Sequence, residues 1–352
     1  MRDKNRKTEN LYFQKRKRQF ELNTNELKKI APFPKNSLIE LNNSCNHACL
    51  FCKNSDQIRS ATQLKIETFE KFISQAAPLG LKEVGLYSTG EPFITKDIEK
   101  YIALAKIYGI QRIYLTTNGA IATLEKVKQC FYAGLNSIKF SINAANAEDY
   151  LKIHGKDDFE KVLKNVKDIY NWKTKNNIQL QMLCSCVLIP KLEHTEQLHK
   201  KKFFKYFEDT NYVKTHSQGG QAFQLQISNE YKSSVFHETF NSIHANKPCQ
   251  LPWNRVHLTA EGYLTACCVD YDLDLVFGNI KEDSLINIWN NDIIQKLRDK
   301  HLKDNLSGLL CDQCMNNRPA PYKPLTKVTK NLMSSQLRKV KLEKLIKRFK
   351  EI

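Results

Sequence analysis

The sequence predicts an α/β fold that is built around a parallel sheet and followed by a smaller, cysteine-rich region. The first observation is an alternation of short apolar runs with amphipathic helical patterns, which begins near residue 37 and is typical of consecutive βαβ units. The second is the placement of the 11 cysteines, several of which stand in Cys-x2-Cys or Cys-Cys pairs. The length of 352 residues allows one large domain with a small addition.

The expected strands are the apolar runs of this alternation, and the expected helices are the amphipathic segments between them. Strands are predicted over residues 37–41, 83–87, 112–115, 137–142, 178–189 and 223–227. Helices are predicted over residues 68–77, 97–108, 124–133 and 158–172. In β/α barrels the functional residues lie at the C-terminal ends of the strands, so we expect the site among the residues that follow each strand.

The positive charge of the chain is concentrated at its ends. The formal net charge is +18, of which residues 1–18 carry +6 and residues 321–352 carry +8. A basic tail is usually a solvated or loosely docked segment, so this distribution does not favour nucleic-acid binding. Residues 1–30 are expected to form a basic tail, and residues 9–14 within it resemble a viral protease site of the kind that a tag leaves.

The chain has no run of 18 apolar residues and no apolar segment of a signal peptide at its start. We therefore expect a cytoplasmic protein, in which paired cysteines are metal ligands rather than disulfides. Residues 321–352 carry apolar side chains near helical spacing, with lysines between them. Such a helix more commonly docks on its own domain, and the alternative is peripheral contact with an anionic membrane surface.

The stretch with the clearest chemistry is a loop of three cysteines after the first expected strand. Cys45, Cys49 and Cys52 are spaced four and then three residues apart. Thiolates normally hold all the irons of a 4Fe–4S cluster, so three cysteines on one loop leave one iron without a protein ligand. An open coordination position distinguishes a catalytic metal site from a closed structural one. A structural zinc site is the alternative, although this spacing is unusual for zinc knuckles.

This loop resembles the Cys-x3-Cys-x2-Cys motif of the radical S-adenosylmethionine (SAM) superfamily, with Phe51 as the aromatic residue before the last cysteine. Residues 88–92, Ser-Thr-Gly-Glu-Pro, are similar to the family's Gly-Gly-Glu-Pro motif, which holds the methionine amino group. Residues 116–119 and 141–143 follow apolar runs where the family lines its SAM pocket. The resemblance implies a partial (β/α)6, TIM-like barrel over residues 31–245.

The resemblance also implies which residues bind the cofactor. Cys45, Cys49 and Cys52 would hold one 4Fe–4S cluster, whose open iron would bind the amino and carboxylate groups of SAM and whose electron would yield a 5′-deoxyadenosyl radical. The residues expected at the methionine end are Thr89, Gly90 and Glu91, and those expected at the carboxylate and ribose are Thr117, Asn118, Ser141 and Asn143. The alternative for each is a polar residue that caps a strand end.

A second cysteine group resembles the auxiliary-cluster domain called SPASM. From Cys249 to Cys267 the chain reads as a cysteine, twelve residues, a glycine, four residues and a cysteine, and Glu261-Gly262 within it is a plausible hairpin turn. A later Cys-x2-Cys fits the shorter twitch domain, here over residues 246–320. The implied ligands of one auxiliary 4Fe–4S cluster are Cys249, Cys267, Cys311 and Cys314. A zinc ribbon on the same residues is the alternative.

By the same resemblance, the expected function is hydrogen abstraction from a small polyol, sugar or nucleotide-sugar. A cluster on four thiolates has no open iron and would relay electrons, which favours dehydrogenation of a hydroxyl carbon. An epimerase would instead need a thiol that returns hydrogen, and the spare thiols are Cys268, Cys184 and Cys186. Each of these is more commonly a small, buried core residue.

Two further functions stay open at this point. Many SPASM-bearing enzymes modify ribosomally made peptides, but the stretch before Cys45 is short and charged for a leader-binding domain, which favours a small molecule. A non-catalytic iron–sulfur or zinc-binding module is the third alternative. The resemblance implies a flavodoxin or a ferredoxin as the reductant.

Overall fold

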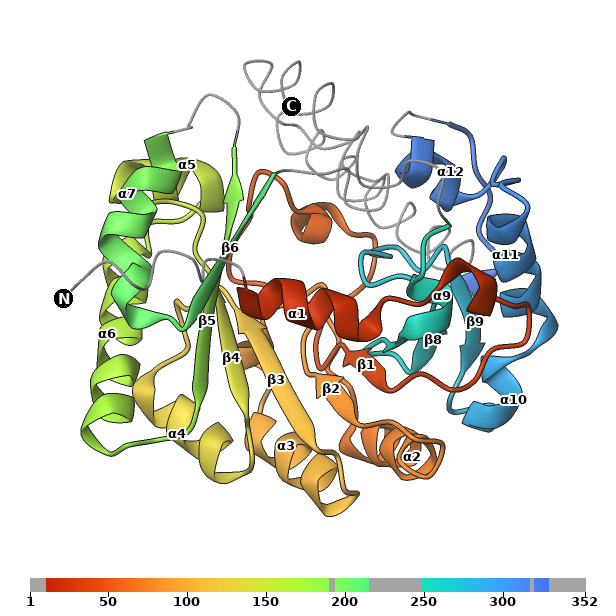
Figure 1. Cartoon of the computed structure of the whole chain (residues 1–352), viewed down its shortest axis with the longest axis horizontal. Helices are drawn as coiled ribbons and strands as arrows, with labels where there is room; N and C mark the ends of the chain where they lie inside the picture. Colours follow the sequence, from red (N-terminus) through yellow and green to blue (C-terminus); the bar gives the residue numbers. More distant parts are fainter. Residues whose placement is uncertain (1–10, 190–193, 215–247, 317–319, 329–352) are drawn as a thin grey trace, which may run out of the picture.

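The computed structural model describes residues 11–189, 194–214, 248–316 and 320–328. Its centre is one nine-stranded sheet with the order β6-β5-β4-β3-β2-β1-β7-β8-β9 (Figure 1). The parallel strands are β1 (Asn36–Ile39), β2 (Glu83–Gly85), β3 (Arg112–Thr117), β4 (Ser137–Ser141), β5 (Gln181–Leu188), β6 (Asp209–Lys214) and β7 (Val256–Leu258). The last two strands, β8 (Tyr263–Thr265) and β9 (Val276–Asn279), are antiparallel. The parallel α/β architecture expected from the sequence is confirmed.

Helices connect the parallel strands and cover one face of the sheet. They are α2 (Ile66–Ala76), α3 (Ile98–Ile107), α4 (Leu124–Tyr132), α5 (Ala147–His154), α6 (Phe159–Lys175) and α7 (His194–Phe203). Four short 3-10 helices add η1 (Thr24–Glu26), η2 (Lys53–Asp56), η3 (Pro92–Ile94) and η4 (Phe204–Tyr206). Because a crossover between parallel strands needs a dozen or more residues, each helix of the pattern returns the chain to the start of the next strand.

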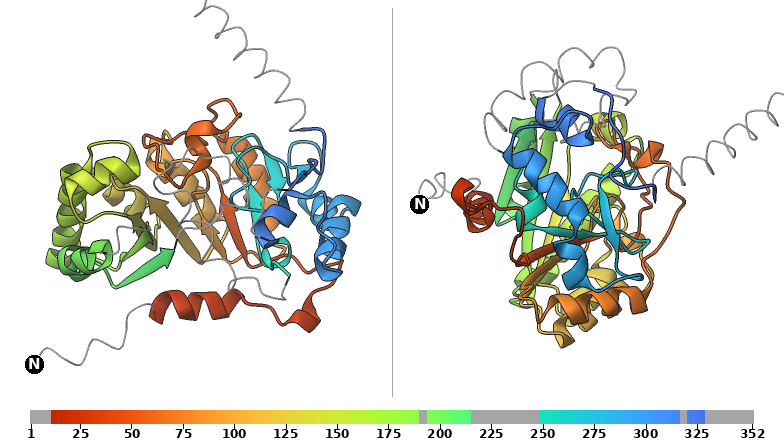
Figure 2. Two further views of the ribbon diagram at one scale, coloured as in Figure 1. Left: turned by 90° about the horizontal axis from the view of Figure 1, so that it is seen from above. Right: turned by 90° about the vertical axis from the view of Figure 1, so that its right-hand side faces the viewer.

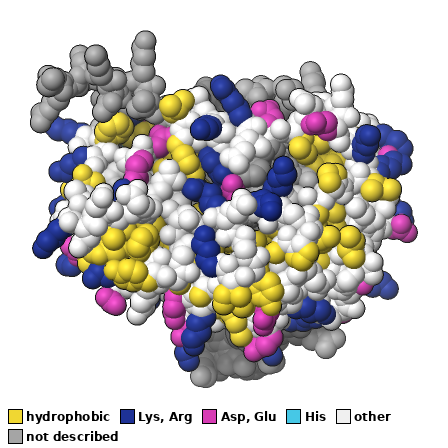
Figure 3. Space-filling model, turned by 60° about the horizontal axis from the view of Figure 1, so that its bottom comes forward, with side chains coloured by type: hydrophobic (Ala, Val, Ile, Leu, Met, Phe, Trp, Pro, Cys, Tyr) yellow, Lys and Arg dark blue, Asp and Glu magenta, His cyan; other side chains and the backbone are white. Residues whose placement is uncertain are grey.

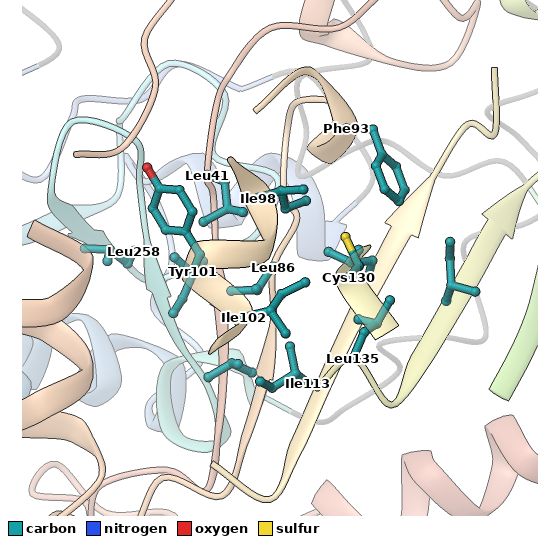
Figure 4. Close-up of a cluster of buried hydrophobic side chains, with 14 of the residues drawn as sticks. Leu41, Leu86, Phe93, Ile98, Tyr101, Ile102, Ile113, Cys130, Leu135 and Leu258 are labelled. Carbon is teal, nitrogen blue, oxygen red and sulfur yellow. The ribbon is translucent and has the colours of Figure 1, made fainter. Parts of the chain in front are cut away.

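The main core lies between this helical layer and the sheet. Tyr101 and Ile102 of α3 and Cys130 of α4 pack with Leu86 and Ile113 of the strand region (Figure 4). All five side chains are buried. Alternation in β3 leaves every second side chain for the opposite, inner face of the sheet.

The C-terminal region continues the same sheet. Val256 of β7 pairs with Ser37 of β1, and Gly262, at φ +95°, turns the chain from β7 into β8, as expected for the hairpin. Helices α9 (Leu251–Asn254), α10 (Leu285–Trp289), α11 (Asp292–Leu302) and α12 (Leu310–Asn316) pack around the hairpin. The guanidinium of Arg298, fully buried in α11, donates to the carbonyl oxygen of Pro252 at 2.9 Å.

The expectation for the N-terminal end of the chain needs correction. Part of the predicted N-terminal tail forms helix α1 (Leu11–Phe20), which lies across the inner side of the curved sheet (Figure 2). Arg16 of α1 forms an ion pair with Glu83, and the backbone N–H of Tyr12 donates to Asp209 Oδ2 at 3.0 Å. The apolar and aromatic residues of α1 stand at its two ends, with a basic run between them, so the helix shows no regular apolar period that a sequence search would find.

A strand that the sequence did not predict, β6 (Asp209–Lys214), pairs with β5. Among the described strands β6 has one neighbour, and its sequence, Asp-Thr-Asn-Tyr-Val-Lys, is mostly polar, as edge strands often are. Residues 223–227 lie outside the described part, as do residues 329–352 of the predicted C-terminal helix. Within the described residues, no helix is both long enough and apolar enough to span a bilayer.

Candidate metal centre

The three-cysteine loop is fixed by backbone hydrogen bonds to the end of α5. The N–H of Ala48 donates to His154 O at 3.1 Å, and the N–H of Leu50 donates to Ile153 O at 2.9 Å. Gly155 ends α5 at φ +68°, and a Cβ there would lie 2.8 Å from Ala48 O. The cysteine loop therefore packs so closely against the end of α5 that only glycine fits at position 155.

The segment 88–92 supports the loop from the other side. The N–H of Glu91 donates to Ser44 O at 2.8 Å. A Cβ on Gly90 would lie 2.4 Å from Asn42 O and 2.7 Å from Ser44 O, so the backbone of this segment touches the backbone that leads into the first cysteine. The structure thus brings two of the predicted motifs into direct contact.

Glu91 is a buried carboxyl that joins the ends of β2 and β3. Its oxygens accept from Thr117 Oγ1 at 2.7 Å and from the N–H of Asn118 at 2.8 Å. Burial raises the pKa of Glu91 to about 7, against the lowering effect of these hydrogen bonds. The Glu91 carboxyl therefore holds the ends of β2 and β3 together, and it changes its charge close to neutral pH.

The three thiols of the loop fit a metal cluster. All three are free and partly exposed, and Cys49 is close enough to Cys45 and Cys52 for their charges to interact. Burial raises the pKa of Cys45 to about 11 and raises the pKa of Cys49 and of Cys52. Three half-buried thiols with raised pKa values fit a site in which a metal supplies the positive charge that stabilises the thiolates.

Two side chains that the sequence did not indicate contact these thiols. His154 places Nδ1 3.4 Å from Cys49 Sγ, and Tyr271 places its hydroxyl 3.4 Å from Cys52 Sγ. One potential ligand atom each of His47, Cys49 and His154 lies within 4.8 Å of the others. His47 Nε2 also bonds Asp158 Oδ2 at 3.1 Å, so this imidazole is already held by a carboxylate.

The remaining predicted SAM-binding residues surround the loop. Asn118 donates to Asn46 Oδ1 at 2.8 Å and lies 3.8 Å from Cys45 Sγ. Asn143 Oδ1 accepts from the N–H of Val187 at 2.8 Å, while Ser141 ends β4 on its partly buried side. Phe51 packs against the main core. The strand-end positions predicted from the sequence thus gather at one edge of the sheet.

Thr89 instead serves a buried charge network. Its hydroxyl bonds the carboxylate of Glu40, which forms an ion pair with Arg59, and Arg59 also pairs with Glu261. Burial would raise the pKa of Glu40, but Arg59 and Thr89 hold it below its usual value. Lys53 pairs with Asp272 in the same way. These ion pairs join the cysteine loop to the C-terminal region. Their partners are far apart in the chain, so the sequence alone does not predict which charges pair.

The four cysteines of the second group converge. Cys249, Cys267, Cys311 and Cys314 line one small, mainly apolar cavity together with Ala266, Leu275 and Met315. Burial raises the pKa of Cys249 to about 12, and burial together with the charges of Cys249 and Cys314 raises the pKa of Cys311. Four thiols around one closed space fit a cluster whose irons are all ligated by protein.

The spare thiols separate into two environments. Cys184 and Cys186 point to the helical face, where Cys184 Sγ lies 3.8 Å from His199 Nε2 of α7 and both are fully buried. Both thiols therefore lie on the opposite face of the sheet from Lys139 and Leu183, and their role as hydrogen donors stays a prediction. Cys268 is partly exposed and lies near Arg255 and His257.

That inner cavity has a volume of about 510 Å³ and lies between the inner face of the sheet, α1 and residues 248–255. Tyr87, Tyr114, Thr116 and Lys139 line it. Concave sites of this size are typical for small-molecule ligands.

Comparison with known proteins agrees with this geometry. The radical SAM superfamily matches residues 39–182, and the iron–sulfur cluster-binding domain SPASM matches residues 249–315. A relative described as a probable GTP 3′,8-cyclase of Pyrococcus abyssi is 26% identical over 278 residues, which cover 68% of this chain and 86% of the relative.

Two solved structures share the fold. A crystal structure of BtrN in complex with AdoMet and 2-DOIA has a TM-score of 0.53 at 19% identity and covers 82% of this chain and 94% of that one. A structure of Streptococcus suis SuiB bound to the precursor peptide SuiA has a TM-score of 0.62 at 14% identity, with 85% and 76% covered. At these identities the likeness shows the fold.

Proposed function

Because the chain belongs to the radical SAM superfamily and carries a C-terminal SPASM iron–sulfur domain, we propose that it abstracts hydrogen from a small polyol, sugar or nucleotide-sugar bound in the inner cavity. The observation that carries the proposal is the convergence of the three-cysteine loop with residues 88–92 and the ends of β3 and β4. The cofactors would be two 4Fe–4S clusters and SAM. When bound, the first cluster and SAM supply a 5′-deoxyadenosyl radical that can remove hydrogen from an unactivated C–H bond.

The chain's own residues position this chemistry. Cys45, Cys49 and Cys52 would hold the first cluster, and the backbone of Thr89, Gly90 and Glu91 would receive the methionine end of SAM. Asn118 and Asn143, whose side chains are already oriented by hydrogen bonds, would face the carboxylate and the ribose, with Ser141 beside them. Preorganised polar groups cost no reorganisation when the ligand binds.

The net reaction that we favour is oxidation of a hydroxyl carbon to a carbonyl. One hydrogen atom leaves with 5′-deoxyadenosine, one further electron leaves the substrate, and the hydroxyl proton is released. The second group, Cys249, Cys267, Cys311 and Cys314, would hold an auxiliary 4Fe–4S cluster, which supplies the acceptor for that electron. The relative's name describes GTP as its substrate, which supports a ribose- or sugar-bearing molecule over a peptide.

Epimerisation is the second candidate, because one thiol is placed for it. Cys268 interacts electrostatically with Lys139 and Tyr87, two residues that line the inner cavity. A thiol at this position could return a hydrogen atom to the substrate radical. A Cys268→Ala variant would then keep hydrogen abstraction and lose the epimerised product.

Iron counting tests the two cluster sites. A Cys45/Cys49/Cys52 triple-alanine variant, reconstituted without oxygen, should retain roughly four irons per chain, the content of one 4Fe–4S cluster. The matched variant, with Cys249, Cys311 and Cys314 changed to alanine, should also retain roughly four. Zinc in place of iron in the first variant contradicts the proposal for the second group.

Product analysis tests the reaction. The reconstituted enzyme, supplied with SAM and dithionite in heavy water, should form 5′-deoxyadenosine faster with pooled nucleotide-sugars and glycosides than with pooled peptides. A product without deuterium supports dehydrogenation, and a deuterated product supports epimerisation through Cys268. Stimulation by peptides alone rejects the substrate class.

A further inference from the structure

Cationic side chains outnumber anionic ones in the lining of the inner cavity. Lys and Arg side chains gather near the middle of the molecular face in Figure 3, with few acidic side chains among them. The charged residues that line the cavity are Arg16, Lys17, Arg112, Lys139 and Arg255, against Glu21. Arg16 and Lys17 belong to the basic N-terminal segment, whereas Arg112, Lys139 and Arg255 come from the rest of the chain.

Two of these cations are already bound by the protein. Arg16 is neutralised by the ion pair with Glu83. Arg112 donates to Gln181 Oε1 at 2.7 Å and also to the hydroxyl of Tyr12. Neither is needed to explain why the cavity would attract an anion.

Lys139 and Arg255 are different. Among the residues that the structure describes, neither forms an ion pair, and Arg255 Nε is buried without a hydrogen-bond partner. Lys139 Nζ lies 5.9 Å from the centre of the Tyr87 ring, which is a weak partner for a desolvated ammonium. Both residues are half-buried and line the cavity, so an anion that binds there can reach their charges without first breaking an ion pair with another described residue. A cavity lined by both Lys139 and Arg255 favours the binding of an anionic ligand.

Their position relates them to the cofactor end of the barrel. Lys139 is in register with Thr116 on β3 and with Leu183 on β5. Ser141 follows two residues later on the same side of β4, roughly 7 Å further along the strand. An anion bound at Lys139 would therefore lie below the strand ends, and the rest of the ligand could extend toward them.

We propose that the substrate carries a phosphate group and that Lys139 and Arg255 bind it within the inner cavity. This inference rests on the proposed function, because it takes the cavity as the substrate site. Arg matches a phosphate in a planar, two-point manner, and Lys adds a point charge. Tyr87 and Tyr114 offer aromatic surfaces beside the cations, which suit a ring of the same ligand better than a long acidic peptide.

Calorimetry on the cluster-loaded protein tests the proposal without requiring turnover. The probes are uridine diphosphate, glucose 1-phosphate and uncharged methyl glucoside. We expect both phosphates to bind at least tenfold more tightly than the glucoside, and binding to weaken as salt is raised. Tighter binding of uridine diphosphate than of glucose 1-phosphate would identify a nucleotide as the source of the phosphate, and the reverse would identify a sugar phosphate.

Variants locate the site. Lys139→Gln and Arg255→Gln should each weaken phosphate binding at least tenfold, whereas Lys139→Arg should retain most of it. Lys167→Gln, on the exposed side of α6, is the matched control and should bind like the original protein. Melting temperatures and iron content of all four variants show whether a loss of binding follows a loss of fold.

The outcomes separate this inference from the proposed function. Equal binding of the three probes, or unchanged phosphate binding by both glutamine variants, would overturn the phosphate assignment. Phosphate binding that depends on Lys139 and Arg255 but stimulates no 5′-deoxyadenosine would keep the assignment and reject the proposed reaction. Stimulation by the glucoside alone would do the opposite.

Discussion

His154 Nδ1 lies 3.4 Å from Cys49 Sγ, while His154 Nε2 lies 3.3 Å from the backbone N–H of Asn143. A backbone N–H can only donate, so Nε2 is the accepting nitrogen and the proton of the neutral ring is on Nδ1. Burial lowers the pKa of His154 to about 3, which keeps the ring neutral. The imidazole therefore directs an N–H at the sulfur of one predicted cluster ligand.

This relationship predicts an effect on the reduction potential of the first cluster. A hydrogen bond to sulfur stabilises the more negative, reduced state, so His154→Leu should lower the potential by roughly 30–60 mV, the equivalent of about 1 kcal/mol for one electron. A redox titration followed by electron paramagnetic resonance measures it. His199→Leu, which removes a buried imidazole beside Cys184, is the control, and an equal shift in it would contradict the assignment.

Gly90→Ala should prevent the first cluster from assembling. The new methyl group would lie 2.4 Å from Asn42 O and 2.7 Å from Ser44 O, which no side-chain movement can relieve because both atoms belong to the backbone. Iron analysis should fall from roughly eight to roughly four irons per chain. In the control, Gly80→Ala, the new Cβ meets nothing within 4 Å and only the positive φ is strained; that variant should keep its iron.

The stability of the metal-free protein should fall as pH rises from about 5 to about 7. Burial raises the pKa of Glu91 from 4.5 to about 7, so in this window the folded state binds more protons than the unfolded state, and raising the pH favours unfolding. The contribution is of the order of 1–3 kcal/mol. Urea unfolding of the original protein and of Glu91→Gln at several pH values measures it, and equal pH slopes would refute the assignment.

Arg59→Ala should be strongly destabilising. It leaves the buried carboxylate of Glu40 without its cation, and breaking one partner of a buried ion pair costs roughly 3–5 kcal/mol. Glu261 also pairs with Arg59, but the Glu261 side chain is 20% accessible. Glu261→Gln should therefore cost less than about 1 kcal/mol. Similar losses in the two variants, measured by urea unfolding, would mean that the Glu40 charge is not buried in solution.

The parts of the fold that show a regular apolar period or a regular cysteine spacing could be predicted from the sequence. Alternating apolar runs predicted β1 to β5, α2, α3, α4 and α6, and cysteine spacing predicted which thiols converge. The polar strand β6, the eight-residue helix α5 and the basic helix α1 show no apolar period long enough to predict them, so they were missed. For Cys184 and Cys186, alternation predicted a shared face but not which one, because both faces of a parallel sheet are covered.

The contacts that tune the centre could not be predicted in the same way. His154 and Cys49 are 105 residues apart, and Tyr271 and Cys52 are 219 apart. Neither histidine nor tyrosine stands in a motif with its partner. Such pairs arise only when the strand order brings α5 and the C-terminal hairpin to the same edge of the sheet.

The pairing of β7 with β1 means that the C-terminal region is joined to the barrel by a shared ladder of backbone hydrogen bonds as well as by covalent chain. Removing it would strip β1 of a neighbour and expose a ready-made template for intermolecular strand addition. The region therefore cannot be exchanged as an independent cassette. The distance between the two cysteine groups is therefore fixed by the sheet, whereas a flexible linker would let it vary.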